Sequence, residues 1–469
     1  MKVLLLLLLA TSSWTDIRCF QPPPSDSDDF LQVVTKSAYD KYGLALEAIF
    51  SMGLRLQGIM DTSTEDNFVV SPLSTTAIIG QMLLGANGEF REQLYQLLSL
   101  PKMTTSFRVT YYNQYKGQND TQVLPYAMFH MQLAALIKEL RHRKPGEEFV
   151  LTLDNALFHE QRIRLNEVFE HSLNNLYHTE ITPLDFRTDT SRIINDWAST
   201  HTNGLIKSFL SGRLPPSTAA LFLNSIYFLA EWETPFADLL NNVDDFHVNA
   251  NKTARSTFMM GNIIDIPFVQ TKNFRMVCLP YKKREVGMYI LLPNIDHEHK
   301  YNIKKFTEQT SAQEILKAFS DMRPHDVTVK IPKVALSNTL DILRPLQKYA
   351  SFDKYYNKMR KTGSANVNSL DEITQRVRDY KNFRPHRNDD VFLTNAAVNV
   401  PLRVSDIFQQ MVFSINEKGT EAAAVTGGFT DYMGGGKSMV LNRPFSFFIR
   451  HEETQAALFW GTISNPAKN

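Results

Sequence analysis

The sequence contains few cysteines and almost no net charge, and each of these features excludes a class of protein. Among 469 residues only Cys19 and Cys278 are cysteines, too few for a disulfide scaffold or a four-cysteine zinc site. Lys and Arg total 50 and Asp and Glu total 49, so a formal charge of +1 gives no overall attraction to nucleic acid or to an anionic membrane. Hydrophobic residues make up 43% and charged residues 21%, which predicts an ordinary soluble globular protein.

Common enzyme motifs are also lacking. The string GGGKS at 434–438 resembles the end of a phosphate-binding loop, but that motif needs glycine where Asp431 stands. It also needs a helix afterwards, whereas MVLNRPFSFFIR is typical of a strand. Neither a G-x-S-x-G elbow nor an H-E-x-x-H helix is present. His297 and His299 alternate with acidic residues, which favours a solvated loop over a metal site. We therefore expect no catalytic residues, no metal and no cofactor.

The first residues indicate export from the cell. Lys2 precedes an apolar run over 3–10, which is far shorter than the about 20 residues that span a bilayer. A basic start, a short apolar run and small residues behind it are typical of a secretory signal peptide. We expect residues 1–19 to be this signal, with cleavage after Ser12 or after Cys19.

Two sequons agree with secretion. They are Asn119-Asp-Thr and Asn251-Lys-Thr, which are acceptors for N-linked glycans in secreted proteins. We expect a monomeric extracellular glycoprotein with no membrane partner and no nucleic-acid partner.

Hydrophobic periodicity predicts a mixed fold. After a disordered lead-in over 20–37, apolar residues at helical spacing predict a helix over 38–57, and residues 75–100 predict two helices interrupted at the GANG sequence. Strands are predicted at 149–158, 219–229, 274–280, 286–292, 327–334 and 440–463, the third and fourth as a hairpin around YKKRE. Because helices and strands alternate without a regular βαβ repeat, we expect an α+β domain.

Two polar stretches interrupt these patterns. Residues 101–122 are polar and rich in tyrosine, and we expect an inserted loop there. In residues 354–387, Lys and Arg clearly outnumber Asp and Glu, and apolar residues show no period. This stretch is a candidate binding site for a sulfated glycan or another polyanion; the alternative is a solvated surface insertion.

The segment EKGTEAAAVTGG at 417–428 carries an unusual alternation. Every second residue is small and uncharged, namely Thr420, Ala422, Ala424, Thr426 and Gly428. A strand with such a face can be buried between other strands without leaving a charge unpaired, while Glu421 on the other face stays in water. The segment therefore suits an exposed loop in one state and a central strand in another.

The order and spacing of several blocks, together with this segment, resemble the serpin family of suicide-substrate serine-protease inhibitors from about residue 40 to residue 466. The blocks are NFVVSPLSTTAIIGQMLLGANG (67–88), INDWASTHTNGLIKSFL (194–210), NSIYFLAEWETPF (224–236), LPY (279–281), RPFSFFIR (443–450) and LFWGTISNP (458–466).

The resemblance implies a single α+β domain over 38–469 with three β-sheets and about eight or nine helices. It also implies an exposed reactive loop over 417–442. Two stretches, near 101–122 and 354–395, are longer than the connections usual in the family.

The resemblance also assigns site residues by position. The hinge, where loop insertion begins, consists of Glu417, Gly419, Thr420, Glu421, Ala422, Ala423 and Ala424. The shutter, where strands of the central sheet part, includes Ser71, Ser74 and Asn224, and the breach at the end of that sheet contains Trp232.

One shutter position departs from the family. Gln409 stands where the family usually has histidine. A glutamine amide can still bridge a serine and an asparagine by hydrogen bonds, but it does not titrate as histidine does.

The family's usual spacing places the bond cut by the protease between Met433 and Gly434. Methionine there suits an elastase-like or chymotrypsin-like target. Tyr432 is a neighbouring alternative for a chymotrypsin-like enzyme, and the Lys437–Ser438 bond is a trypsin-type alternative.

The sequence thus predicts a secreted inhibitor that traps a serine protease and is not itself an enzyme. The alternative is a non-inhibitory serpin that acts as a carrier, a chaperone or a glycan-binding protein. Bulky, charged or proline residues on the inserting face would favour that alternative, and none occurs from Thr420 to Gly428.

Overall fold

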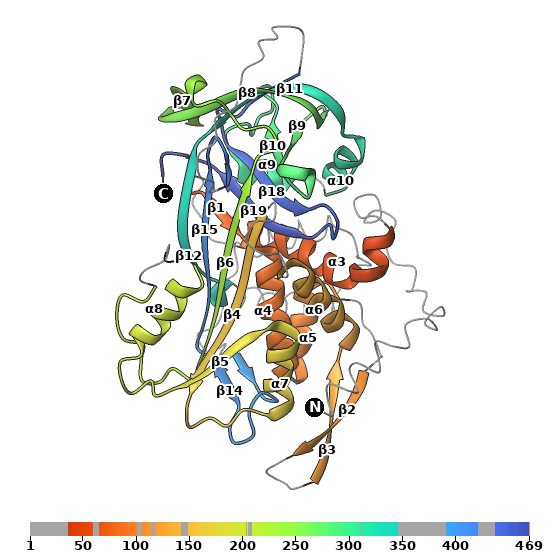
Figure 1. Cartoon of the computed structure of the whole chain (residues 1–469), viewed down its shortest axis with the longest axis vertical. Helices are drawn as coiled ribbons and strands as arrows, with labels where there is room; N and C mark the ends of the chain where they lie inside the picture. The colour runs from red at the N-terminus through yellow and green to blue at the C-terminus, as the bar shows by residue number, and fades with distance from the viewer. Residues whose placement is uncertain are drawn as a thin grey trace, which may run out of the picture.

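The computed structural model of the chain describes residues 36–59, 65–100, 106–113, 118–141, 149–202, 204, 209–310, 312–345, 391–420 and 437–468. The predicted signal peptide, the basic stretch and most of the reactive loop lie outside these ranges. The first helix begins at Lys36, so the last two residues of the expected lead-in already belong to it. Figure 1 shows long strands running along the longest axis of the molecule, with helices packed beside them.

The central sheet has six strands. Its order is β12 (Val334–Asp341), β15 (Asp406–Ile415), β6 (Ala220–Glu231), β4 (Phe149–Glu160) and β5 (Thr179–Leu184), with the short β16 (Gly419–Thr420) paired to β6. Strands β15 and β6 run parallel, whereas β16 runs antiparallel to β6. The sheet is therefore mixed, as expected for an α+β fold.

The second sheet has nine strands. Its order is β1 (Phe68–Val70), β19 (Ala457–Ile463), β18 (Phe445–His451), β10 (Val286–Pro293), β9 (Phe274–Pro280), β8 (Lys252–Gln270), β11 (Arg323–Pro332) and β17 (Lys437–Val440), with β7 (Asn242–Asn249) on β8. The long β8 pairs with β9 over its last three residues only. Strand β8 therefore joins β9 to β11 within one continuous sheet.

Eight α-helices occur within the described ranges. They are α3 (Lys36–Ile59), α4 (Pro72–Gly85), α5 (Gly88–Leu97), α6 (Ala127–Arg141), α7 (Glu167–Tyr177), α8 (Ser191–Thr200), α9 (Ile303–Gln309) and α10 (Ala312–Asp321). Two short 3-10 helices, η1 (Asp238–Leu240) and η2 (Lys282–Arg284), complete the helical elements of this part of the chain.

Local sequence explains the start and end of the central helix α4. The Ser71 hydroxyl accepts a hydrogen bond from the Ser74 amide, and Pro72 occupies the first helical position, where its missing N–H costs nothing. The predicted break at GANG is confirmed: α4 ends at Gly85, and Asn87 caps the next helix. All residues of α4 are buried, because it packs against the central sheet, β19 and neighbouring helices.

The two faces of the central sheet pack against different helices. Even-numbered residues of β6, such as Phe228 and Ala230, belong to the main core, which includes α4. Odd-numbered residues, such as Leu221 and Leu223, form a smaller core with Trp197 of α8. Side chains of even-numbered and odd-numbered residues of β6 thus enter different cores.

Strands were predicted well where their apolar pattern was strong. The expected hairpin is β9 paired with β10, and β4 and β6 match their predicted ranges within a few residues. Strand β17 begins at Lys437, inside GGGKS, and β18 follows it, so strands stand here as expected rather than the helix of a phosphate-binding loop.

The predicted loop over 101–122 is wrong. Strands β2 (Ser106–Asn113) and β3 (Gln118–Pro125) pair antiparallel as a hairpin, which projects from one end of the molecule in Figure 1. The sequence SFRVTYY is rich in aromatic and β-branched residues, which favour strands. Another small sheet pairs β13 (Val391–Leu393) with β14 (Leu402–Val404), so the second insertion ends in a strand.

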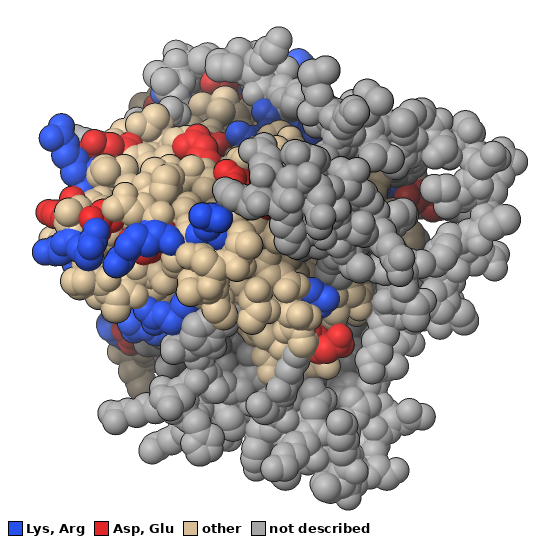
Figure 2. Space-filling model, turned by 90° about the horizontal axis from the view of Figure 1, so that it is seen from below, with Lys and Arg blue, Asp and Glu red and all other residues tan. Residues whose placement is uncertain are grey.

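The surface seen from below carries no single sign of charge. Figure 2 shows basic and acidic side chains interspersed along one edge of the described part of this face. None of the helices in the described ranges has the length and apolar character needed to cross a membrane.

Candidate functional site: the open end of the central sheet

Strands β15 and β6 separate at one end of the central sheet, and the hinge lies in the gap. Their pairing ends at Val412 and Tyr227. Beyond that point, Thr420 of β16 pairs with Ala230 of β6, whose other neighbour is Phe149 of β4. Strand β16 therefore occupies the side of β6 from which β15 has departed.

A tight turn sends the chain from β15 back into this gap. The Asn416 side-chain oxygen accepts hydrogen bonds from the backbone amides of Lys418 (3.0 Å) and Gly419 (3.2 Å). Gly419 has φ +153°, and an added Cβ would lie 2.0 Å from the Ala230 carbonyl oxygen. Only glycine fits this approach of the hinge to β6.

Thr420 is already part of the sheet. It is fully buried, and its hydroxyl lies 2.8 Å from the Tyr281 hydroxyl. Burial raises the pKa of Tyr281, so the phenol stays neutral and can share its proton with Thr420. The expectation of an exposed loop is thus wrong at its first inserting residue.

The other predicted hinge residues divide between two groups. Glu417, Gly419 and Thr420 are described, whereas Glu421, Ala422, Ala423 and Ala424 lie outside the described residues. Because Thr420 sits opposite Ala230, it points toward the core that includes α4. This agrees with the sequence-based choice of Thr420 as a member of the buried face.

Trp232, the predicted breach residue, joins the turn to the sheet. Its indole N–H donates to the Asn416 carbonyl oxygen at 2.9 Å, and its amide donates to the Lys418 carbonyl oxygen at 2.7 Å. The indole stacks on Tyr281, with ring centroids 4.4 Å apart. Trp232 therefore contacts both the turn that precedes Thr420 and the ring that holds it.

Glu417 fixes the start of the hinge by an ion pair. It is 7% exposed, and its carboxylate accepts hydrogen bonds from Lys333 at 2.7 Å and from the Asn241 amide. Burial alone would raise the pKa of Glu417, but the Lys333 ammonium and the hydrogen bonds to the carboxylate outweigh it, so this pKa is lowered. The amide of Phe236 donates to the Glu417 carbonyl oxygen at 2.7 Å.

Gln409 links the central sheet to the start of α4. Its side-chain oxygen accepts from the Ser71 amide at 2.9 Å, and its nitrogen lies 3.3 Å from the Ser71 carbonyl oxygen and 3.4 Å from Asn224 Oδ1. Asn224 in turn donates to Asn155 on β4 at 3.0 Å. The structure thus brings together Ser71, Gln409 and Asn224, and the predicted bridge by glutamine is geometrically formed.

Two features of this network differ from the sequence-based interpretation. Ser74 contributes only its backbone amide to the cap; its hydroxyl is buried and, within the described chain, has no hydrogen-bond partner. Asn155 and Thr75, which contacts Gln409 at 3.4 Å, were not singled out. Asn155 lies opposite Asn224 in the sheet, a relation that only the strand order reveals.

The two candidate reactive bonds are placed differently. Met433, Gly434 and the neighbouring Tyr432 lie outside the described residues. Lys437 and Ser438 lie in β17, which pairs in parallel with β11. The Ser438 carbonyl oxygen also accepts a hydrogen bond from Arg275 at 2.8 Å.

The remaining candidates belong neither to the hinge turn nor to the Gln409 network. Asn251 is exposed in the turn between β7 and β8, and Asn119 belongs to β3. His299 lies 3.4 Å from Glu298, but no cluster of three metal-binding side chains occurs in the described ranges. Cys278 is buried and unbridged.

Comparison with known proteins places the chain in a family. The family model described as serpin (serine protease inhibitor) matches residues 47–466. Human serpin B4 is 25% identical over 419 residues, which cover 86% of this chain and 95% of that protein. Human plasminogen activator inhibitor 2 is 26% identical over 441 residues (89% and 98%), and the leukocyte elastase inhibitor of Xenopus tropicalis is 25% identical over 416 residues (87% and 95%).

A solved structure agrees on the fold. Human thyroxine-binding globulin superposes with a TM-score of 0.67 at 20% identity, covering 91% of this chain and 99% of that one. The predicted α+β fold is therefore confirmed. The matched family model spans most of the chain, and the chain belongs to the serpin family of serine protease inhibitors.

Proposed function

We propose that this protein is a secreted suicide-substrate inhibitor of a serine protease. The observation that carries this proposal is β16: the hinge is seated on β6 in the gap that β15 leaves. A loop whose first residues already pair with the sheet has a defined path along which the rest can follow. A loop that only connected two strands would not need its first residues to pair with the central sheet.

The register of β16 predicts that path. Gly419 faces Glu231 and Thr420 faces Ala230, so continued antiparallel pairing puts Ala422 opposite Phe228. The next residue, Ala423, would meet Tyr227, where β15 and β6 are still paired. Insertion therefore has to part these two strands from Val412 and Tyr227 onward.

The same register predicts which side chains become buried. Thr420 points toward the core that contains α4, and its alternate neighbours would follow it on that face. All are small and uncharged, so their burial leaves no unpaired charge. Glu421 would lie opposite Leu229, on the other face of the sheet.

Loop insertion gives a mechanism of inhibition. The target's serine attacks the carbonyl carbon of the reactive bond, forms an ester and releases the new amine of the following residue. The freed segment then joins the central sheet, gaining ladder hydrogen bonds and apolar burial. Because the protease stays tethered to the inserting strand, its catalytic geometry is pulled apart before the ester is hydrolysed.

The placement of β17 supports Met433–Gly434 as the reactive bond. Lys437 and Ser438 are held in a paired strand, and a protease can cut there only after this pairing is removed. Met433 precedes that strand in the chain. We therefore propose an elastase-like or chymotrypsin-like target over a trypsin-like one.

Incubation with elastase-like, chymotrypsin-like and trypsin-like proteases tests the proposal. The expected product is a covalent complex that survives boiling in detergent, together with a released peptide that begins at Gly434. A peptide beginning at Ser438 would move the specificity residue to Lys437. Cleavage without a complex at any protease ratio would contradict the inhibitory function and favour a carrier.

Secretion and glycan attachment belong to the same proposal. The signal-like residues 1–19 support secretion, and Asn251 is exposed at a turn, as a glycan acceptor has to be. Expression in a secreting cell should yield protein whose mass falls after enzymatic removal of N-glycans. The basic stretch 354–387 is proposed to bind sulfated glycan. Its test is retention on a heparin column, compared with a variant whose basic residues there are replaced by glutamine.

A further inference from the structure

Two arginines with unmatched charge lie near the end of the β9–β10 hairpin that is remote from its turn. Arg443, in the connection between β17 and β18, is 3% exposed. Its guanidinium donates to the Pro293 carbonyl oxygen at 2.5 Å and to Asn442 Oδ1 at 3.3 Å. Arg275, at the start of β9, is half-buried and donates to the Ser438 carbonyl oxygen.

The two guanidinium groups are close enough to repel each other. Phe274 pairs with Pro293 and Arg275 pairs with Leu292, so Arg275 adjoins the strand end that Arg443 holds. Burial, together with the positive charge of Arg275, lowers the pKa of Arg443 to about 10. Burial also lowers the pKa of Arg275.

Neither arginine has an anionic partner within the described chain. The Nε–H groups of Arg275 and Arg443 are both buried and have no hydrogen-bond partner there. The hydrogen bonds that these two guanidinium groups make go to neutral oxygens. Arg450 shows the usual arrangement instead: it is buried and pairs with the Glu452 carboxylate at 2.5 Å.

Such a pair is costly unless an anion neutralises it. A buried charge without a counter-charge loses its hydration and gains no Coulomb energy in return. Two like charges add their mutual repulsion to that cost. Guanidinium groups bind phosphate and sulfate oxygens well, because their N–H donors match the spacing of oxyanion oxygens.

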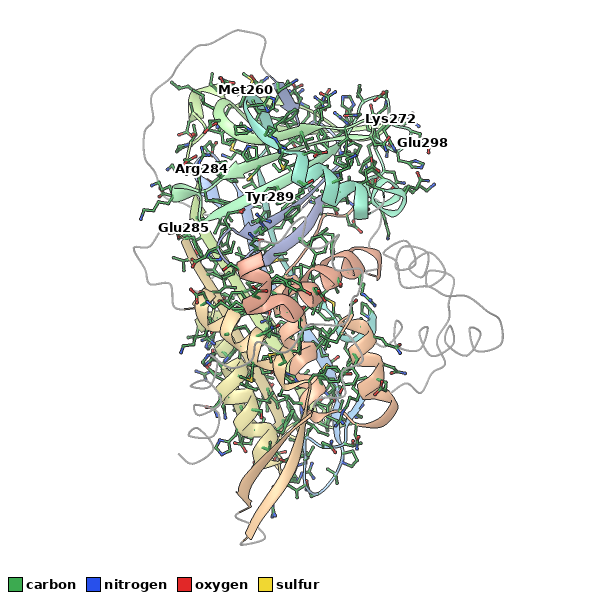
Figure 3. The ribbon with its side chains drawn as sticks, turned by 90° about the vertical axis from the view of Figure 1, so that its right-hand side faces the viewer. Met260, Lys272, Arg284, Glu285, Tyr289 and Glu298 are labelled. Atoms are coloured by element: carbon green, nitrogen blue, oxygen red, sulfur yellow. The ribbon has the colours of Figure 1, made fainter. Side chains whose placement is uncertain are left out.

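We propose that Arg275 and Arg443 form a binding site for a tetrahedral oxyanion, a phosphate or sulfate group. The two positive charges match the charge of such a group, and the two unused Nε–H groups are its donors. Lys272, labelled in Figure 3, lies in the turn just before β9, three residues before Arg275.

Oxyanion binding at this site would act on β17. Arg275 holds the Ser438 carbonyl oxygen, which belongs to the strand on the carboxyl side of the reactive loop. An oxyanion that neutralises and orders Arg275 strengthens this contact. The site is thus positioned to stabilise β17, the strand that follows the reactive loop. This effect does not depend on whether the protein traps a protease.

The test is a thermal-melting and calorimetric titration of the full chain with inorganic phosphate, inorganic sulfate and a sulfated disaccharide. Sodium chloride at matched ionic strength is the reference. We expect phosphate and sulfate to raise the melting temperature above the chloride reference, and Arg275→Gln to weaken their binding about tenfold. Binding of the disaccharide as well, lost in the same variant, would identify a glycan as the source of the group; binding of the free ions alone would identify a free anion.

A matched variant separates this site from general surface charge. Lys272→Gln removes one positive charge from the adjacent turn and should leave phosphate binding unchanged. In chloride buffer free of phosphate and sulfate, Arg275→Gln should be at least as stable as the wild type, because the repulsion is relieved. Equal melting temperatures in phosphate and chloride, or equal losses in the two variants, would overturn the proposal.

One measurement needs no variant. Phosphate should slow hydrogen exchange of the β17 amides in the wild-type protein, because Arg275 holds the carbonyl of Ser438 more firmly. Unchanged exchange at β17 in saturating phosphate would overturn the placement of the anion beside Arg275.

Discussion

Replacement of Thr420 by arginine tests the insertion mechanism at its first step. Thr420 is fully buried, pairs with the backbone of β6 and contacts Tyr281, on whose ring the indole of Trp232 stacks. No acidic side chain is among these contacts. A guanidinium at this position would be buried without a partner, which costs about 3–5 kcal/mol.

The free-energy cost of burying this guanidinium is smaller before cleavage of the loop than after its insertion. Before cleavage, the introduced side chain can swing out with β16, and the protein loses only the short pairing to β6 and the Tyr281 contact, about 1 kcal/mol for each hydrogen bond. After cleavage, full insertion requires the same side chain to be buried under the rest of the strand. Insertion is therefore slowed, and each increase of about 1.4 kcal/mol in its barrier lowers the rate about tenfold.

The assay compares the yield of detergent-stable complex with the amount of cleaved inhibitor at several protease ratios. Thr420→Arg should be cut at the same bond and at a similar rate, but the yield of complex should collapse. Its melting temperature should not rise after cleavage. Thr420→Ser keeps a small side chain with a hydroxyl and serves as the control, with complex formation close to wild type. Near one-to-one trapping by Thr420→Arg would refute the inserting register.

Four further outcomes follow from the contacts described above. Gln409→Leu leaves the buried Ser71 amide without its acceptor and should lower stability by about 1–3 kcal/mol in urea unfolding. Glu417→Gln should lower the melting temperature at neutral pH, and the difference from wild type should shrink as pH falls below 4.5, because protonation then removes the wild-type ion pair as well. Burial lowers the pKa of His130 from 6.5 to about 3, so wild-type stability should fall as pH drops through this interval. The stability of the His130→Gln variant should fall less steeply over the same pH range. Reducing agent should leave the melting temperature unchanged, because the Cys278 thiol is buried and unbridged.

The elements that sequence predicted were those fixed by local pattern. The break between α4 and α5 depends on Gly85 to Gly88, where a cap residue and glycines stand next to each other in the chain. The β9–β10 hairpin follows from two apolar runs around a charged turn. In both cases the residues that decide the structure lie within a few positions of one another, so periodicity and turn chemistry suffice.

The features that sequence missed depend on distant contacts. Thr420 is buried because Tyr281 and Trp232, from other parts of the chain, meet at the end of the sheet. Asn155 enters the Gln409 network because β4 lies beside β6, an order that no local pattern encodes. The β2–β3 hairpin was missed for a different reason: its polar composition outweighed the strand preference of its aromatic and β-branched residues.

The contacts of Gln409 at the shutter and of Glu417 at the hinge depend differently on pH. At the shutter, Gln409 joins β15 to Ser71 through an amide that has no titratable proton. At the hinge, Glu417 pairs with Lys333, and its lowered pKa keeps this pair intact at neutral pH. The native hinge is therefore held by the same contacts across the physiological pH range. Under the proposed mechanism, cleavage of the loop, rather than a change in protonation, would release the strand to insert.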